Sequence, residues 1–349
     1  MMPAAPATRS IGWIAGAGLV LVGAALLGIM IGPAGPAWYR VPLDLLDSLP
    51  GVSVDSGLTA QQHDLIWQIR MPRVVLAALV GGALSISGAS YQGVFRNPLV
   101  DPYQLGVAAG AGMGATIVFA FGRGVTKGWV VDPVVLAAFT GGLIAVAITY
   151  TAGTAFGVGR RPEALVLAGV AVVSFLTAIQ TYVLQRHSEV LRSVYSWILG
   201  QLTSSQWSDV RLVLPYVAVA CAVLLVHGRL LDVLRVGDDE AAALGAQVRR
   251  IRLTVVLAAT IATAAVVSVS GLIGFVGIIV PHIVRLLVGG SYRRVLPVSL
   301  LGGAAFLILA DLAGRMVIRP AELPIGVVTA FFGAPFFLFV LHTTVREHR

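Results

Sequence analysis

The feature that most constrains this chain is a series of apolar runs, each at least about as long as a lipid bilayer is thick. In the longest run, residues 253–288, His282 and Arg285 are the only charged or imidazole side chains. A helix that crosses the hydrocarbon core needs about 20 residues, so this run is long enough for two crossings. The glycines at its centre favour a break. We therefore predict two helices joined by a tight turn near residues 271–274.

Eight further apolar runs bring the predicted number of transmembrane helices to ten. They cover residues 11–31, 74–94, 105–121, 130–151, 164–184, 212–226, 295–318 and 323–341. Charged residues make up 11% of the chain, against about 25% in soluble domains, which is too few to coat a water-soluble globule. With 57% hydrophobic residues the chain is not disordered either. We predict an all-α, polytopic membrane protein with a single transmembrane domain over residues 1–349.

The arginines predict the orientation of that domain. Ten crossings place both termini on one side, and 14 of the 24 basic residues fall on that side. The positive-inside rule makes this side cytoplasmic. The expected organisation is a cytoplasmic tail at 1–10, a ten-helix bundle over 11–342, a cytoplasmic loop at 229–250 and a second tail at 343–349. The arginines are spread between apolar runs, which favours membrane lipid over nucleic acid as a partner.

A weak internal repeat fits this layout. Residues 74–78 recur as residues 255–259, and residues 85–88 resemble residues 268–271. The two copies begin on opposite sides of the predicted membrane, which is the inverted-repeat arrangement common in transporters. Chance similarity in a chain rich in alanine and valine is the alternative.

The sequence contains no energy source of its own. Lys127 is the only lysine, and it is not part of the Gly-Lys-Ser/Thr motif of a P-loop. No catalytic or metal-binding pattern is present, so we expect a transport pathway rather than an enzyme, without a cofactor. A proton-coupled secondary carrier that uses Asp311 and His282 is the alternative, because ionisable residues inside membrane spans often carry coupling ions.

A short helix is expected in the loop after the sixth crossing. Asp238 can cap it, Asp239 and Glu240 suit its first turn, and Gly245 can end it. An ordinary connecting helix is the alternative to a docking surface for a separate energy source.

Six stretches of the sequence, in order, resemble the FecCD family of type II ABC-importer permeases, which carry iron–siderophore complexes, haem or vitamin B12. These stretches are residues 70–73, 97–106, 238–245, 274–285, 310–315 and 321–336. The resemblance implies a ten-helix permease that works as a homodimer in the cytoplasmic membrane. Two ATPase subunits, which bind ATP and Mg²⁺, would dock on the cytoplasmic face, and a substrate-binding protein on the outer face. An iron–siderophore complex is the expected cargo, with haem or cobalamin as alternatives.

The resemblance also implies roles for particular residues. The coupling helix that receives the ATPase motion would comprise Asp238, Asp239, Glu240, Ala241, Ala242, Leu244 and Gly245. The cytoplasmic gate would comprise Asn97, Pro98 and Leu99. Arg70, Arg73 and Arg315 would dock the binding protein, with membrane-interface snorkelling as the alternative. Asp311 precedes Arg315 by one helical turn, and this spacing predicts an ion pair between the two.

Overall fold

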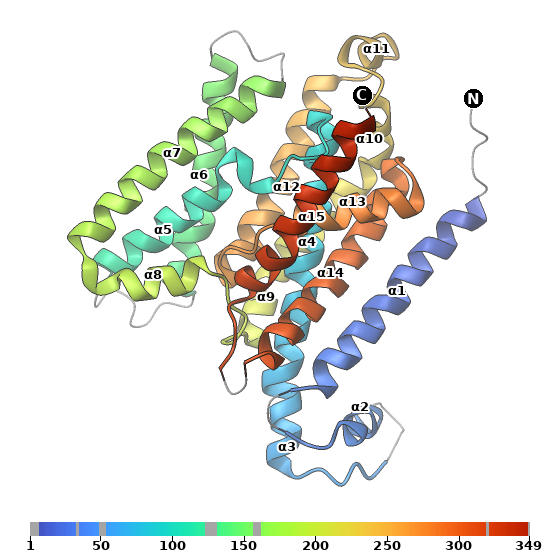
Figure 1. The fold of residues 1–349 in the computed structure, drawn as a ribbon, viewed down its shortest axis with the longest axis vertical. Helices are drawn as coiled ribbons and strands as arrows, with labels where there is room; N and C mark the ends of the chain where they lie inside the picture. The colour runs from blue at the N-terminus through green and yellow to red at the C-terminus, as the bar shows by residue number, and fades with distance from the viewer. Residues whose placement is uncertain are drawn as a thin grey trace.

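The computed structural model describes residues 7–32, 35–48, 54–122, 131–155, 162–318 and 321–347, and these residues form helices and connecting loops without a strand. Among these residues, ten longer helices form the bundle, and Figure 1 shows their arrangement. They are α1 (Ala7–Met30), α4 (Met71–Phe95), α5 (Val107–Phe121), α6 (Pro133–Ala155), α7 (Pro162–Arg186), α9 (Trp207–Val226), α12 (Val248–Ser270), α13 (Val276–Val288), α14 (Tyr292–Met316) and α15 (Ile325–Glu347).

Short elements connect the long helices. The α-helical ones are α2 (Val41–Asp47), α3 (Ala60–Asp64), α8 (Leu191–Ile198), α10 (Gly228–Leu234) and α11 (Asp238–Ala243). The others are the 3₁₀ turns η1 (Trp38–Arg40), η3 (Pro102–Leu105) and η4 (Ser188–Val190) and the π-helical turn η2 (Leu65–Arg70).

Each of the ten segments predicted to cross the membrane contains a helix. Seven of the described helices are long and apolar enough to cross a membrane, and α5, α13 and α15 are shorter apolar helices. The predicted break in residues 253–288 is also present. The helix α12 ends at Ser270, Gly271 has φ +69°, and α13 starts after Phe275, which also has φ +69°. A positive φ cannot continue a right-handed helix, so the chain leaves the helical path at both residues.

The two ends of the bundle differ. The start of α1, the end of α15 and the short helix α11 lie at one end, which we call the α11 end, and α2 and α3 lie at the other, the α2–α3 end (Figure 1). Of the predicted tails, residues 1–6 and 348–349 lie outside the described residues. The helices extend further than expected into both tails, because α1 begins at Ala7 and α15 continues to Glu347.

The helix α4 runs through the centre of the bundle, and glycines allow its neighbours to approach closely. A Cβ added to Gly81 would collide with the carbonyl oxygen of Gly303 in α14, and one added to Gly88 would collide with that of Gly277 in α13. Small residues at such crossings let membrane helices pack backbone against backbone. These contacts hold α4, α13 and α14 together as one unit.

The helix contacts support the inverted repeat. The helix α4 contacts α14 and α12 contacts α6, while α5–α6–α7 pack on one another as α13–α14–α15 do. The segments that precede α5 and α13 also correspond to each other, because each is contacted by a glycine of the third helix in its group. Gly169 of α7 faces the backbone of Gln104, and Gly333 of α15 faces the side chain of Phe275. Helices α4 and α12 start at opposite ends of the bundle (Figure 1), as the repeat predicts.

Candidate functional site

A buried network of charges links α4, α14 and the loop before α15 at the α2–α3 end. Arg73 donates from Nε and Nη2 to the Asp311 carboxylate at 2.9–3.1 Å, and from Nη1 and Nη2 to Glu322 at 3.1 and 2.8 Å. Asp311 also forms an ion pair with Arg315 at 3.1 Å, which confirms the pairing expected from their spacing. Asp311 therefore serves two arginines from one buried carboxylate.

Arg70 occupies a neighbouring position against the end of α1. Its Nη1 donates to the carbonyl oxygens of Ile29 and Met30 at 2.8 and 3.2 Å. A Cβ on Gly32 or Gly35 would collide with, or crowd, its guanidinium group. The C-terminal carbonyls of α1 are the negative end of that helix dipole, which favours a cation there.

The three arginines expected to dock a binding protein are thus not surface residues in this conformation. Arg70, Arg73 and Arg315 are 5%, 8% and 3% exposed. The groups that these arginines bind belong to this chain. Of the two carboxylates in the network, Glu322 is more exposed than Asp311. The partners of Arg73 are 238 and 249 residues away from it in sequence, and only the fold brings them together.

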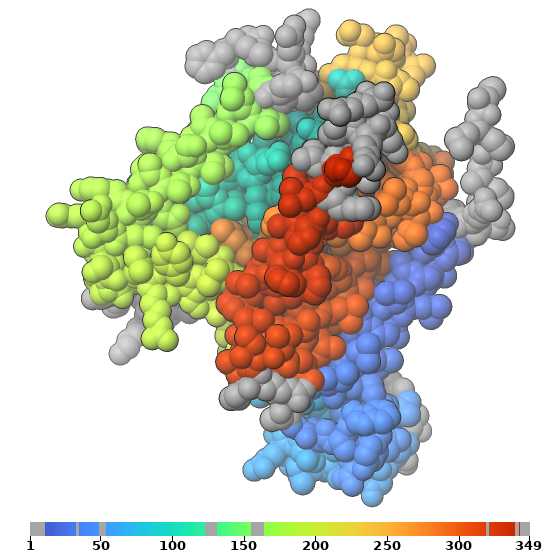
Figure 2. Space-filling model, viewed as in Figure 1, coloured from blue at the N-terminus to red at the C-terminus, as the bar shows by residue number. Residues whose placement is uncertain are grey.

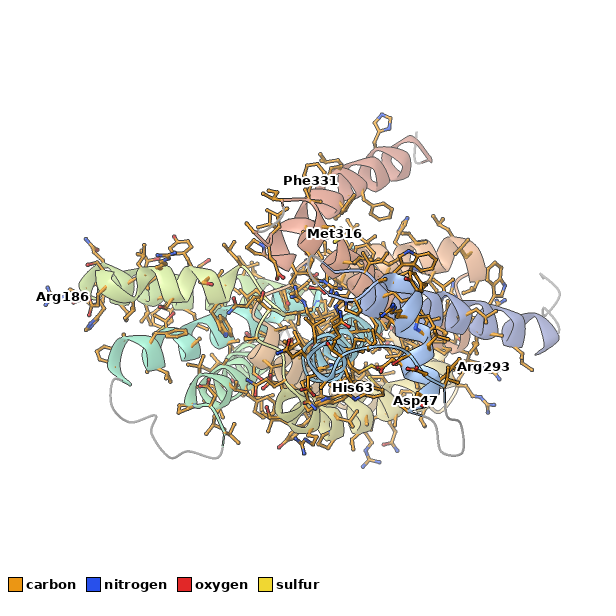
Figure 3. The ribbon with its side chains drawn as sticks, turned by 90° about the horizontal axis from the view of Figure 1, so that it is seen from below. Asp47, His63, Arg186, Arg293, Met316 and Phe331 are labelled. Atoms are coloured by element: carbon orange, nitrogen blue, oxygen red, sulfur yellow. The ribbon has the colours of Figure 1, made fainter. Side chains whose placement is uncertain are left out.

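Sequence reasoning missed Asp44, the residue that organises the polar α2–α3 segment. Its side chain is buried, and it forms hydrogen bonds with Nδ1 of His63 at 2.9 Å and Nε1 of Trp67 at 3.0 Å. Figure 3 views the molecule from this end and labels His63 at its centre. Four acidic residues lie in this segment of the sequence, and nothing in the pattern distinguishes Asp44 from the others.

Glu322 provides a pH-dependent contribution to stability. Burial raises the pKa of Glu322, but the hydrogen bonds and charge of Arg73, with the hydrogen bond from Thr203 at 3.0 Å, outweigh burial and hold that pKa below its ordinary value. A carboxyl group with a depressed folded-state pKa stabilises the protein above its unfolded pKa and loses this contribution as pH falls through the folded pKa.

We therefore expect the Glu322→Gln variant to be less stable than the unmodified protein at neutral pH, by about 1 kcal/mol or more. The difference should shrink as the pH falls below the ordinary range for glutamate. Unfolding temperatures of the two proteins, measured side by side from neutral to acid pH, check this. A constant difference at every pH would contradict the role of the Glu322 carboxylate charge.

The helix predicted at residues 238–245 is present as α11, with one correction, and its coupling role stays a prediction. The helix α11 begins at Asp238, but its N-cap is Gly237, with φ +128°, so Asp238 lies inside the first turn. The Glu240 side chain folds back against Gly237, so a Cβ added to Gly237 would collide with the Glu240 carboxylate. Gly245 follows the helix with φ +83°, as expected of a terminating glycine. Leu244 is 73% exposed, which is unusual for leucine at the polar tip of a protein.

The predicted gate residues lie at the α11 end, directly after α4. The helix ends at Phe95, and Arg96 adopts a left-handed conformation with φ +50°. The Asn97 side chain accepts a hydrogen bond from the Leu99 N–H at 2.9 Å, which forms a compact turn with Asn97 and Pro98 exposed. Whether this turn acts as a gate stays a prediction.

The described residues form a bundle of apolar helices with charged clusters near both of its ends, which is the architecture of a polytopic membrane protein. Residues 12–343 match the FecCD transport family, and the chain belongs to that family. It is the transmembrane permease subunit of an ABC importer.

Relatives of known name cover most of the chain. The uncharacterised ABC transporter permease protein YvrB of Bacillus subtilis is 41% identical over 82% of this chain and 80% of that protein. The cobalamin import system permease protein BtuC of Halobacterium salinarum is 38% identical over 95% and 96%. Among solved structures, an inward-facing metal-chelate type ABC transporter superposes with a TM-score of 0.80 at 29% identity, covering 95% of this chain and 98% of the other.

Proposed function

We propose that this permease imports a metal chelate of the class that includes cobalamin, iron–siderophore complexes and haem. The observation that carries the proposal is the near full-length similarity to a cobalamin permease and to a metal-chelate transporter structure. Cobalamin is the first candidate because its permease covers 95% of this chain. An iron–siderophore complex, the cargo expected from the sequence, is the second, because the solved structure is named only for metal chelates.

The α11 end is proposed to face the cytoplasm and to bind two ATPase subunits, which supply ATP hydrolysis. The exposed Leu244 beside α11 supports a protein contact there, since an apolar side chain at a polar tip gains free energy when a partner covers it. With this orientation both termini are cytoplasmic. The α2–α3 end would then receive the binding protein, and docking through Arg70, Arg73 and Arg315 stays a prediction.

Helices α7 and α15 are proposed to meet a second copy of the chain. Both lie on the face shown in Figure 2, and both carry exposed apolar side chains. Leu167 and Phe175 of α7 are 72% and 67% exposed, and Phe331 of α15 is 75% exposed and points away from the bundle (Figure 3). A homodimer would cover part of this surface and lipid the rest.

Uptake into proteoliposomes tests the proposed function. We expect the permease, reconstituted with the ATPase and binding protein encoded beside it, to accumulate one of three radiolabelled cargoes: cobalamin, a ferric siderophore or haemin. Accumulation should require ATP and should survive a protonophore. Uptake that persists without ATP and collapses with the protonophore would instead support a proton-coupled carrier.

A further inference from the structure

A single carboxylate at the α11 end connects three separate elements. The Asp238 side chain in α11 accepts hydrogen bonds from Nη2 of Arg252 in α12, at 2.9 and 3.2 Å. The same carboxylate forms an ion pair with Nη2 of Arg96 at 3.4 Å. Arg96 is the residue that ends α4 and directly precedes the turn at residues 97–99. An ion pair therefore connects the short helix α11 to the C-terminal end of α4.

The buried arginine of this pair depends on the carboxylate. Arg252 is 8% exposed, and its Nε has no hydrogen-bond partner among the described residues, so Asp238 supplies the counter-charge for a largely buried cation. Arg96 holds a left-handed backbone conformation, which is uncommon for a residue other than glycine. Its position fixes where the following turn begins.

The helix α10, which precedes α11, is anchored to a different part of the bundle. Asp232 accepts hydrogen bonds from the Ser291 hydroxyl and the Tyr292 N–H, both at 2.7 Å. Arg235 donates to the carbonyl oxygen of Gly290 at 2.9 Å. These contacts fix α10 to the turn between α13 and α14, whereas Asp238 connects α11 to Arg96 at the end of α4 and to Arg252 in α12.

We propose that Asp238 is the positioning residue that transmits a displacement of α11 to Arg96 and hence to the turn at residues 97–99. The inference rests on the proposed function, in which the α11 end binds the ATPase subunits, and on the prediction that this turn is the cytoplasmic gate. A shift of α11 carries the carboxylate with it. Arg96 follows because its charge pairs with that carboxylate, and the turn moves because it begins at the next residue.

The test compares the amount of chelate taken up per ATP hydrolysed in proteoliposomes that hold the complete transporter. We expect Asp238→Asn and Arg96→Ala to retain the ATPase subunits and to hydrolyse ATP, but to lower uptake per ATP about fivefold or more, the range of ordinary coupling free energies. The double variant should be no worse than either single variant.

Arg293→Ala is the matched control, since Arg293 is an exposed arginine on the first turn of α14, at the edge of the bundle (Figure 3). It should leave uptake per ATP unchanged. The inference is overturned if the Arg96→Ala variant takes up as much chelate per ATP hydrolysed as the Arg293→Ala variant does. It is also overturned if Asp238→Asn releases the ATPase while Arg96→Ala is normal, because Asp238 would then be a docking residue only. Failure of the unmodified transporter to take up any chelate would contradict the proposed function instead.

Discussion

Asp311→Asn is expected to destabilise the permease by about 3–5 kcal/mol, the cost of removing one partner from a buried ion pair. The carboxylate is 3% exposed and binds both Arg73 and Arg315. An asparagine has the same shape but no charge, so both guanidinium groups would keep their burial and lose their shared counter-ion. Unfolding by SDS in mixed micelles measures the change in free energy.

Two further variants identify the cause of this loss. Asp64→Asn removes an exposed carboxylate at the same end of the bundle and should leave the free energy of unfolding unchanged. Combining Asp311→Asn with Arg315→Met should recover part of the stability, because one of the two unpaired cations is removed while Arg73 keeps Glu322. If Asp311→Asn were as stable as Asp64→Asn, the network would not contribute to the folded state.

The second large effect is expected from Gly88→Ala. The added methyl group would collide with the backbone carbonyl of Gly277, which no side-chain rotation can relieve. Helices α4 and α13 must therefore move apart, and we expect a loss near the upper end of the about 1–3 kcal/mol that overpacking costs. Yield of folded protein and the free energy of unfolding in mixed micelles both report this change.

Gly16→Ala provides the matched comparison. Gly16 lies in the middle of α1, where an added Cβ meets no atom within 4 Å. The same chemical change should there be neutral or slightly stabilising, because alanine favours a helix over glycine. Equal losses from Gly88→Ala and Gly16→Ala would show that helix propensity, and not the contact with Gly277, decides the outcome.

Much of the fold was predictable because membrane insertion depends on local hydropathy. A run of apolar residues must form a helix in lipid, since every backbone polar group there needs an internal partner. The ten helices and the break at Gly271 follow from this rule. The helix α11 also followed from local chemistry. Its cap did not, because Gly237 takes a backbone conformation that sequence alone does not reveal.

The candidate sites were only partly predictable. The sequence placed Arg70, Arg73 and Arg315 at the correct end of the bundle, but treated them as exposed. Their burial depends on Asp311, Glu322 and the carbonyl groups at the end of α1. The ion pair of Arg315 with Asp311 was predictable, because the two residues are one turn apart on a helix.

The sequence by itself determined that the chain is an all-helical membrane protein, because the lengths of the apolar runs are properties of the linear chain, and its six motifs indicated the permease family. The tertiary structure alone decided which charges meet. Arg73 finds Asp311 across 238 positions, and Asp238 joins the ends of α4 and α12. Such pairs form because an isolated charge inside a low-dielectric bundle is too costly to remain without a partner, and only the packed helices specify which partner is within reach.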